Sequence, residues 1–96
     1  MRDEVKLFAE AMEVKLAAND RKGGWRGEPT GYLMRRLRQE VEELGRAREA
    51  YEKARSKVIF AYEVPDIDEL RADVRQEAAD VDNFCMMIAD VVGGLS

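Results

Sequence analysis

The sequence predicts an all-α protein: a single domain over residues 1–96, built as an antiparallel bundle of three main helices. Good helix formers dominate the 96 residues, and only two prolines occur. Apolar residues recur every three or four positions along three long segments. A chain of this length is short for a self-sufficient core, so we expect copies of the chain to associate and complete the bundle.

The first helix is expected over residues 3–20. Asp3 is suited to the N-cap position, and the apolar residues of the segment follow the i, i+3, i+4 pattern: Val5, Phe8, Ala11, Met12 and Leu16. The segment NDRKGGWRGEP (residues 19–29) then interrupts the pattern with three glycines and a proline. We therefore predict a loop between the first and second helices.

The second helix is expected to begin at a Thr30 cap and to continue to about residue 58. Its apolar stripe alternates steps of three and four residues, as in helices that pack side by side: Leu33, Leu37, Val41, Leu44, Ala47, Tyr51, Ala54 and Val58. The apolar run KVIFAY (residues 57–62) either finishes this helix or forms an extended hinge, and the spacing leaves both open.

The third helix is expected to follow Pro65. Asp66 and Glu69 have the spacing of a capping box. The inward-facing residues continue at helical spacing: Ile67, Leu70, Val74, Val81, Phe84, Ile88 and Val91. Gly93 and Gly94 are predicted to end the helix.

Composition excludes several classes of function. The net charge of −4 argues against a nucleic-acid polymer as partner, which usually requires a basic excess. No histidine occurs, so Ser-His-Asp and Cys-His catalysis are excluded. Cys85 is the single cysteine, which excludes an internal disulfide, and its apolar helix predicts a buried side chain. Without a membrane span or a signal-peptide core, a cytoplasmic protein with no membrane partner is expected.

Two acidic pairs interrupt the apolar stripes. At about 100° per residue, Glu40 falls inside the stripe of the second helix, and Glu43 lies at its edge. Glu77 falls inside the stripe of the third helix, and Asp80 lies at its edge, displaced in the same rotational sense. A spacing of three residues places the two carboxylates of each pair side by side. The sequence therefore predicts four carboxylates that face the core.

Such carboxylates need a neutralising partner, because desolvation disfavours their charged form. The residues leave two solutions open. Arginines can pair with the acids, and Arg36, Arg48 and Arg75 are available. Alternatively, a divalent cation can bind among them, and a set of oxygen ligands favours Mg²⁺ or Mn²⁺.

Three blocks of the sequence carry a resemblance to a known family. They are KLAANDRKGGW (residues 15–25), YLMRRLRQEVEEL (residues 32–44) and EAADVDNFCMMIAD (residues 77–90). In this order they resemble the MazG-like all-α nucleoside triphosphate pyrophosphohydrolases, which carry ExxE and ExxD on successive helices. Residues 49–65 match least, and Gln39 stands where many members have the first of two successive glutamates.

The resemblance implies Mg²⁺-dependent hydrolysis of a nucleoside triphosphate to a monophosphate and pyrophosphate. It implies that the acids are both the metal ligands and the catalytic residues: Glu40, Glu43, Glu77 and Asp80. It further implies homodimers or homotetramers. Four more residues are candidates for contact with substrate: Lys22, Trp25, Arg36 and Asn83. Trp25 is expected either to cover the helix ends or to stack on the base.

Two alternatives remain. Phosphoribosyl-ATP pyrophosphatase shares the helical plan and the metal chemistry, although the GGW block favours the first reading. The other alternative is a non-catalytic helical oligomer, such as a regulatory or phage accessory protein, whose acids pair with arginine. Gln39 is the residue that most favours this second class.

Overall fold

The computed structural model describes residues 1–58 and 66–95. These residues form α1 (Asp3–Ala18), the short 3-10 helix η1 (Asp20–Lys22), α2 (Thr30–Val58) and α3 (Ile67–Val91). No strand occurs among the described residues, so the all-α prediction is confirmed. Helix α2 extends to Val58; the rest of the KVIFAY run and Pro65 lie outside the described residues.

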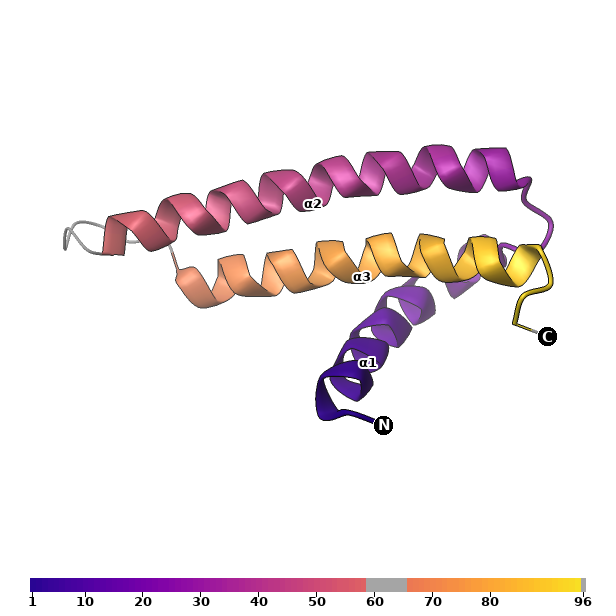
Figure 1. The fold of residues 1–96 in the computed structure, drawn as a ribbon, viewed down its shortest axis with the longest axis horizontal. Coiled ribbons are helices and arrows are strands. Elements are labelled where there is room, and N and C mark those ends of the chain that lie inside the picture. Colours follow the sequence, from indigo (N-terminus) through magenta and orange to yellow (C-terminus); the bar gives the residue numbers. More distant parts are fainter. Residues whose placement is uncertain (59–65, 96) are drawn as a thin grey trace.

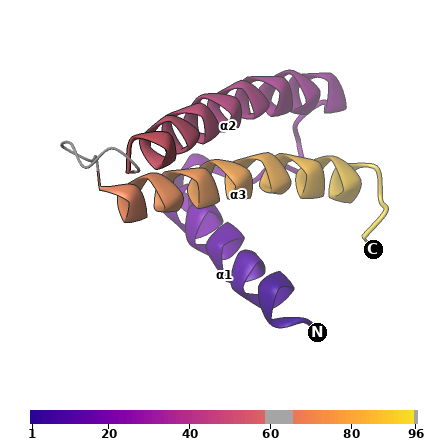
Figure 2. The same ribbon diagram turned by 60° about the vertical axis from the view of Figure 1, so that its left-hand side comes forward.

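The two long helices lie side by side and run in opposite directions, as Figure 1 shows. Helix α1 crosses α3 at a steep angle, which the rotated view in Figure 2 also shows. Within the described residues, α1 packs against α3 and makes no contact with α2. One side of α2 is therefore left uncovered by α1.

The ends of α3 follow from its sequence. Asp66 Oδ1 accepts hydrogen bonds from the backbone N–H groups of Asp68 at 3.0 Å and Glu69 at 3.3 Å, which confirms the Asp66 half of the predicted capping box. At the other end Gly93 has φ of 83°, and the Gly94 N–H donates to the Ala89 carbonyl at 2.8 Å. Together with the bond from Gly93 N–H to Asp90 at 2.9 Å, this is a Schellman motif.

Two predicted caps are displaced by one residue. Arg2, not Asp3, holds the N-cap position of α1, and Asp3 is the first helical residue. There its negative charge still complements the helix dipole. Helix α2 begins at Thr30, and the Pro29 carbonyl accepts the first helical bonds, from Tyr32 and Leu33. Thr30 is therefore a first-turn residue rather than a cap.

The apolar core of the single chain is thin. Among the described residues, the buried apolar side chains are Leu33, Ala54 and Ala79. The radius of gyration is 15.9 Å, whereas a compact chain of this length has about 12.5 Å. Val41, predicted to face inward, is 49% exposed, because α1 does not cover this side of α2.

Cys85 corrects a second prediction of burial. Its side chain is exposed, although its neighbours on α3 are half-buried. In the described part of the chain, α1 and α2 are the elements that pack on α3, and neither buries this side chain. None of the helices in residues 1–58 and 66–95 combines the length and hydropathy that a membrane span requires.

Candidate functional site

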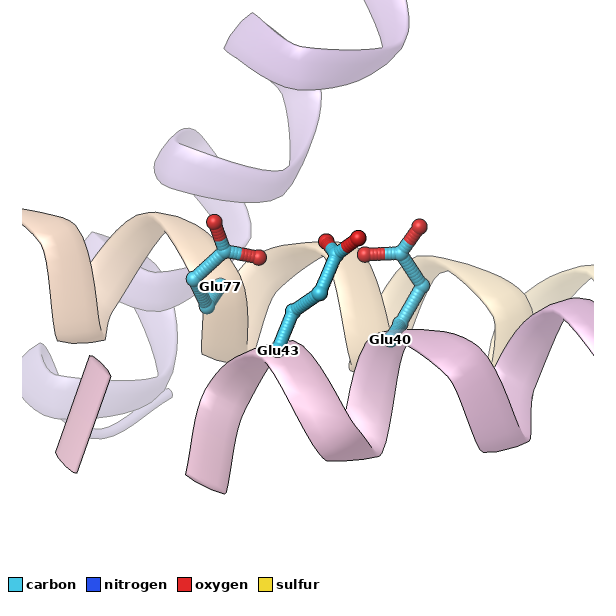
Figure 3. A group of neighbouring side chains, drawn as sticks. All are labelled: Glu40, Glu43 and Glu77. Atoms are coloured by element: carbon cyan, nitrogen blue, oxygen red, sulfur yellow. The ribbon is translucent and has the colours of Figure 1, made fainter. Parts of the chain in front are cut away.

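Three carboxylates meet between the two long helices. Glu40 and Glu43 lie one turn apart on α2, and Glu77 faces them from α3. One oxygen from each side chain lies within 4.8 Å of the others, and Figure 3 shows the three carboxylate groups pointing toward one another. The antiparallel pairing of α2 and α3 produces this arrangement, because the two stripes that carry the acids face each other.

Two oxygens of this cluster are buried without a hydrogen-bond partner among the described residues. Glu40 is only 6% exposed. Neither its Oε2 nor Oε2 of Glu77 has a hydrogen-bond partner in the part of the chain that the structure describes. A buried acceptor without a partner destabilises the fold unless a ligand satisfies it. The cluster therefore has two buried acceptor oxygens that no described residue satisfies.

Burial raises the pKa of two of these acids, Glu40 and Glu77. Glu43, which the sequence predicted to face the core, is exposed. Desolvation, followed by the proximity of Glu43, raises the pKa of Glu40 to about 7, and the Arg36 guanidinium only partly opposes this. Desolvation likewise raises the pKa of Glu77, with further contributions from the charges of Glu43 and Asp80. The protein therefore holds protons on this cluster that exposed carboxyls would release.

Asp80 lies beside the three-residue cluster rather than in it. Its charge acts on both Glu40 and Glu77, so it is near them. Its Oδ2, however, lies 3.3 Å from Nζ of Lys15 on α1. Of the four predicted acids, three share one small volume, and the fourth is engaged by a lysine from the crossing helix.

Arg36 is the arginine that reaches the cluster. Its Nη2 lies 3.1 Å from Glu40 Oε1, and its Nη1 donates to Gln39 Oε1 at 2.5 Å. The guanidinium carbon lies 5.4 Å from the centre of the Phe84 ring, a cation–π distance. The two other arginines considered from the sequence are exposed: Arg48 and Arg75. Arginine pairing thus occurs, but it leaves Glu40 Oε2 unsatisfied.

A pocket of about 680 Å³ adjoins the acids. It lies between the end of α1, the loop over residues 19–29, the start of α2 and the second half of α3. Its lining includes two of the acids, Glu40 and Asp80, and all four residues predicted to contact substrate: Lys22, Trp25, Arg36 and Asn83. The structure therefore brings these six residues to one concavity.

The loop that forms one wall of the pocket is attached to α3. Trp25 is half-buried, and its Nε1 donates a hydrogen bond to Asp90 Oδ2 at 2.9 Å. Arg26 Nε lies 3.8 Å from the same oxygen. Gly23 has φ of 87°, a conformation that other residues rarely adopt. The choice between the two sequence-based roles of Trp25, as a cover and as a stacking surface, stays open.

Asn83 joins α3 to α1. It is 4% exposed, and its Nδ2 donates to the Met12 carbonyl at 3.2 Å. Its Oδ1 is buried and has no hydrogen-bond partner within residues 1–58 and 66–95. The amide is thus fixed in orientation by α1, with an unused acceptor at the pocket lining.

Lys15 is the site residue that the sequence reasoning missed. It follows Met12 by three residues and Phe8 by seven, so it lies on the inward face of α1. A lysine at such a position needs an anionic partner, and this was the available signal. Asp80 supplies that partner.

The cluster has the chemistry of a site for a hard divalent cation. Its donors are carboxylate oxygens, which Mg²⁺ and Mn²⁺ prefer. Two of these oxygens are buried and unused, and the adjoining pocket has room for a phosphate-bearing ligand. In comparisons with protein-family models, with curated proteins and with solved structures, the chain finds no match.

Proposed function

We propose that the protein is a Mg²⁺-dependent nucleoside triphosphate pyrophosphohydrolase with a MazG-like fold, which releases pyrophosphate and a nucleoside monophosphate. One observation carries the proposal: three carboxylates converge within 4.8 Å beside a pocket lined by basic and aromatic side chains. An acidic cluster alone would repel a triphosphate, and a cation bound there reverses that local field.

The ligands in this proposal are Glu40, Glu43 and Glu77, with Asp80 as the fourth. When bound, the cation supplies charge neutralisation and Lewis-acid activation of phosphoryl oxygens and water. Lys22 and Arg36 line the pocket and contact the phosphates. Asn83 offers an amide to the substrate, and Trp25 closes or stacks against the nucleoside.

A second copy of the chain is proposed to cover the open face of α2. Large apolar side chains on α1 and α2 are exposed in the single chain: Val5, Leu7, Val14, Met34 and Val41. Their burial would add apolar area to a core that holds few fully buried side chains. A homodimer or homotetramer in the cytoplasm is the resulting proposal, and the mass measured by light scattering tests the oligomeric state.

The non-catalytic alternative rests on the two ion pairs. Arg36 lies on Glu40 and Lys15 lies on Asp80, so part of the acidic charge is already neutralised. A purely structural site would bind neither cation nor nucleotide.

Pyrophosphate release from a panel of dNTPs, NTPs and phosphoribosyl-ATP, with Mg²⁺ and with EDTA, tests the proposal. Glu40→Gln and Glu77→Gln should lose the Mg²⁺-dependent activity and stay folded by circular dichroism. The matched control is Glu42→Gln, the same change at an exposed position of α2, which should retain it. Full activity in Glu40→Gln would refute the assignment of the site. Turnover of phosphoribosyl-ATP alone would indicate the histidine-biosynthetic enzyme.

A further inference from the structure

We propose that Lys15 and Arg36 are exchangeable counter-ions of the site: each neutralises one acid in the cation-free protein and contacts the phosphates of the nucleotide once a cation binds the acids. This rests on the proposed function, and it adds Lys15 to the substrate-binding residues. It also fixes an order of binding, with the cation first and the nucleotide second.

Arg36 has the geometry that such an exchange requires. It is held by Glu40 and Gln39 on its own helix and by the Phe84 ring on α3. Its side chain is nevertheless 37% exposed, and it lines the pocket. A rotation about its flexible side-chain bonds therefore moves the guanidinium from acid to pocket without any movement of the backbone.

Lys15 repeats the arrangement from a different helix. Its Nζ lies 3.3 Å from Asp80 Oδ2, its side chain is 33% exposed, and it lines the same pocket. Two cations, one from α1 and one from α2, thus line the pocket beside the acids with which they pair. Each is paired with a residue that the proposed function assigns to the metal.

A side chain that is paired with its acid cannot at the same time attract a phosphate strongly. A guanidinium or ammonium that is paired with a carboxylate offers little attraction to an anion in the adjoining pocket, because the pair is nearly neutral at a distance. A divalent cation on Glu40 and Asp80 competes with these partners, and the released positive charges then face the pocket. The cation-free protein is therefore expected to bind phosphate-bearing ligands weakly.

The test measures pyrophosphate binding in EDTA, so that no metal bridges ligand and protein. The double substitution Glu40→Gln/Asp80→Asn removes both acidic partners and should increase pyrophosphate affinity about tenfold over the wild type. The control Glu42→Gln/Asp82→Asn makes the same change of charge at exposed positions of α2 and α3, and it should leave affinity nearly unchanged. Equal gains in both double variants would overturn the proposal, since they would reflect net charge alone.

A further pair of substitutions assigns the gain to the two cations. Adding Lys15→Gln and Arg36→Gln to the Glu40→Gln/Asp80→Asn protein should return pyrophosphate affinity to the wild-type level. Retention of the gain would overturn the proposal. These measurements need neither metal nor turnover, so they are independent of whether the protein hydrolyses nucleotides.

Direct metal binding provides a second test, in the wild-type acidic background. Arg36→Gln removes a competitor for Glu40, but it also removes a charge that lowers the pKa of Glu40. Mn²⁺ binding is therefore measured at pH 8.5, above that pKa, where it should tighten about fivefold, as followed by the spin resonance of free Mn²⁺. A merely structural arginine would give unchanged or weaker Mn²⁺ binding, and that result contradicts the exchange. If no variant binds Mn²⁺, the proposed function fails instead, whereas the pyrophosphate measurement still reports on Lys15 and Arg36.

Discussion

Trp25 Nε1 donates a hydrogen bond of 2.9 Å to Asp90 Oδ2, although 65 residues separate the two in sequence. The bond attaches the loop between α1 and α2 to the last turns of α3, and it places the indole at the wall of the pocket. Because Arg26 Nε also lies 3.8 Å from this oxygen, one carboxylate of a distant helix holds two side chains of the loop.

Trp25→Phe keeps an aromatic ring and deletes the donor to Asp90. A partly buried hydrogen bond of this kind contributes about 1 kcal/mol, so we expect a loss of that order in the free energy of unfolding, measured with urea. If the ring stacks on the base, KM for the nucleotide changes little in Trp25→Phe and rises in Trp25→Ala. An equal rise of KM in both variants would show that the attachment to Asp90, rather than stacking, is what matters.

The stability of the metal-free protein should depend on the protonation of Glu40. Its pKa is raised from 4.5 to about 7 in the folded protein. Between these values the folded state holds a proton that the unfolded state has released. This contribution therefore falls as the pH rises from 4.5 to 7, by an amount on the order of 3 kcal/mol.

Glu40→Gln should remove this loss, because the amide does not titrate. The measurement is the free energy of unfolding in EDTA at pH 4.5 and pH 7.5 for the wild type, Glu40→Gln and the surface control Glu42→Gln. The control should follow the wild type. Parallel pH profiles in all three proteins would contradict the shifted pKa of Glu40.

Divalent cations should stabilise the folded protein at neutral pH. Mg²⁺ or Mn²⁺ binds only the folded arrangement of the acids, so the melting temperature should rise by several degrees at saturating cation. Glu77→Gln removes a ligand from α3 and should abolish the rise, which a thermal-shift titration measures. A flat response of the wild type, with and without nucleotides, would favour the non-catalytic alternative.

Val41→Glu should weaken self-association, because it introduces a charge into the exposed apolar face of α2. The control is Ala50→Glu, on an exposed position nine residues further along α2 and therefore on the opposite face of the helix. Molar mass by light scattering over a range of concentrations should fall for Val41→Glu alone. Wild-type protein that is monomeric at all concentrations would exclude the proposed oligomer.

The spacing of residues predicted much of this architecture, because helix boundaries and stripes are local properties. The Asp66 cap, the end at Gly93 and the inward position of Glu40 all follow from residues within one or two turns. Local spacing could not predict which helices pack against each other. Whether α1 would lie on α2 or on α3 depends on which apolar faces meet.

The packing of α1 on α3 decides the surroundings of two residues that the sequence analysis did not place correctly. With α1 on α3, Lys15 reaches Asp80, and Cys85 stays exposed in spite of its apolar neighbours. Helical periodicity identified the inward-facing acids of both helices, but it could not determine which of their oxygens lie close together. That depends on the longitudinal alignment of α2 and α3, which brings Glu77 to the level of Glu43.

The same alignment gives a bound ion a mechanical role. One helical turn advances about 5.4 Å, more than the 4.8 Å over which the three oxygens are gathered. Sliding α2 along α3 by a single turn would therefore disperse the ligands. An ion bound to residues of both helices would oppose such sliding. Its release would therefore loosen the packing of α2 against α3 as well as empty the site.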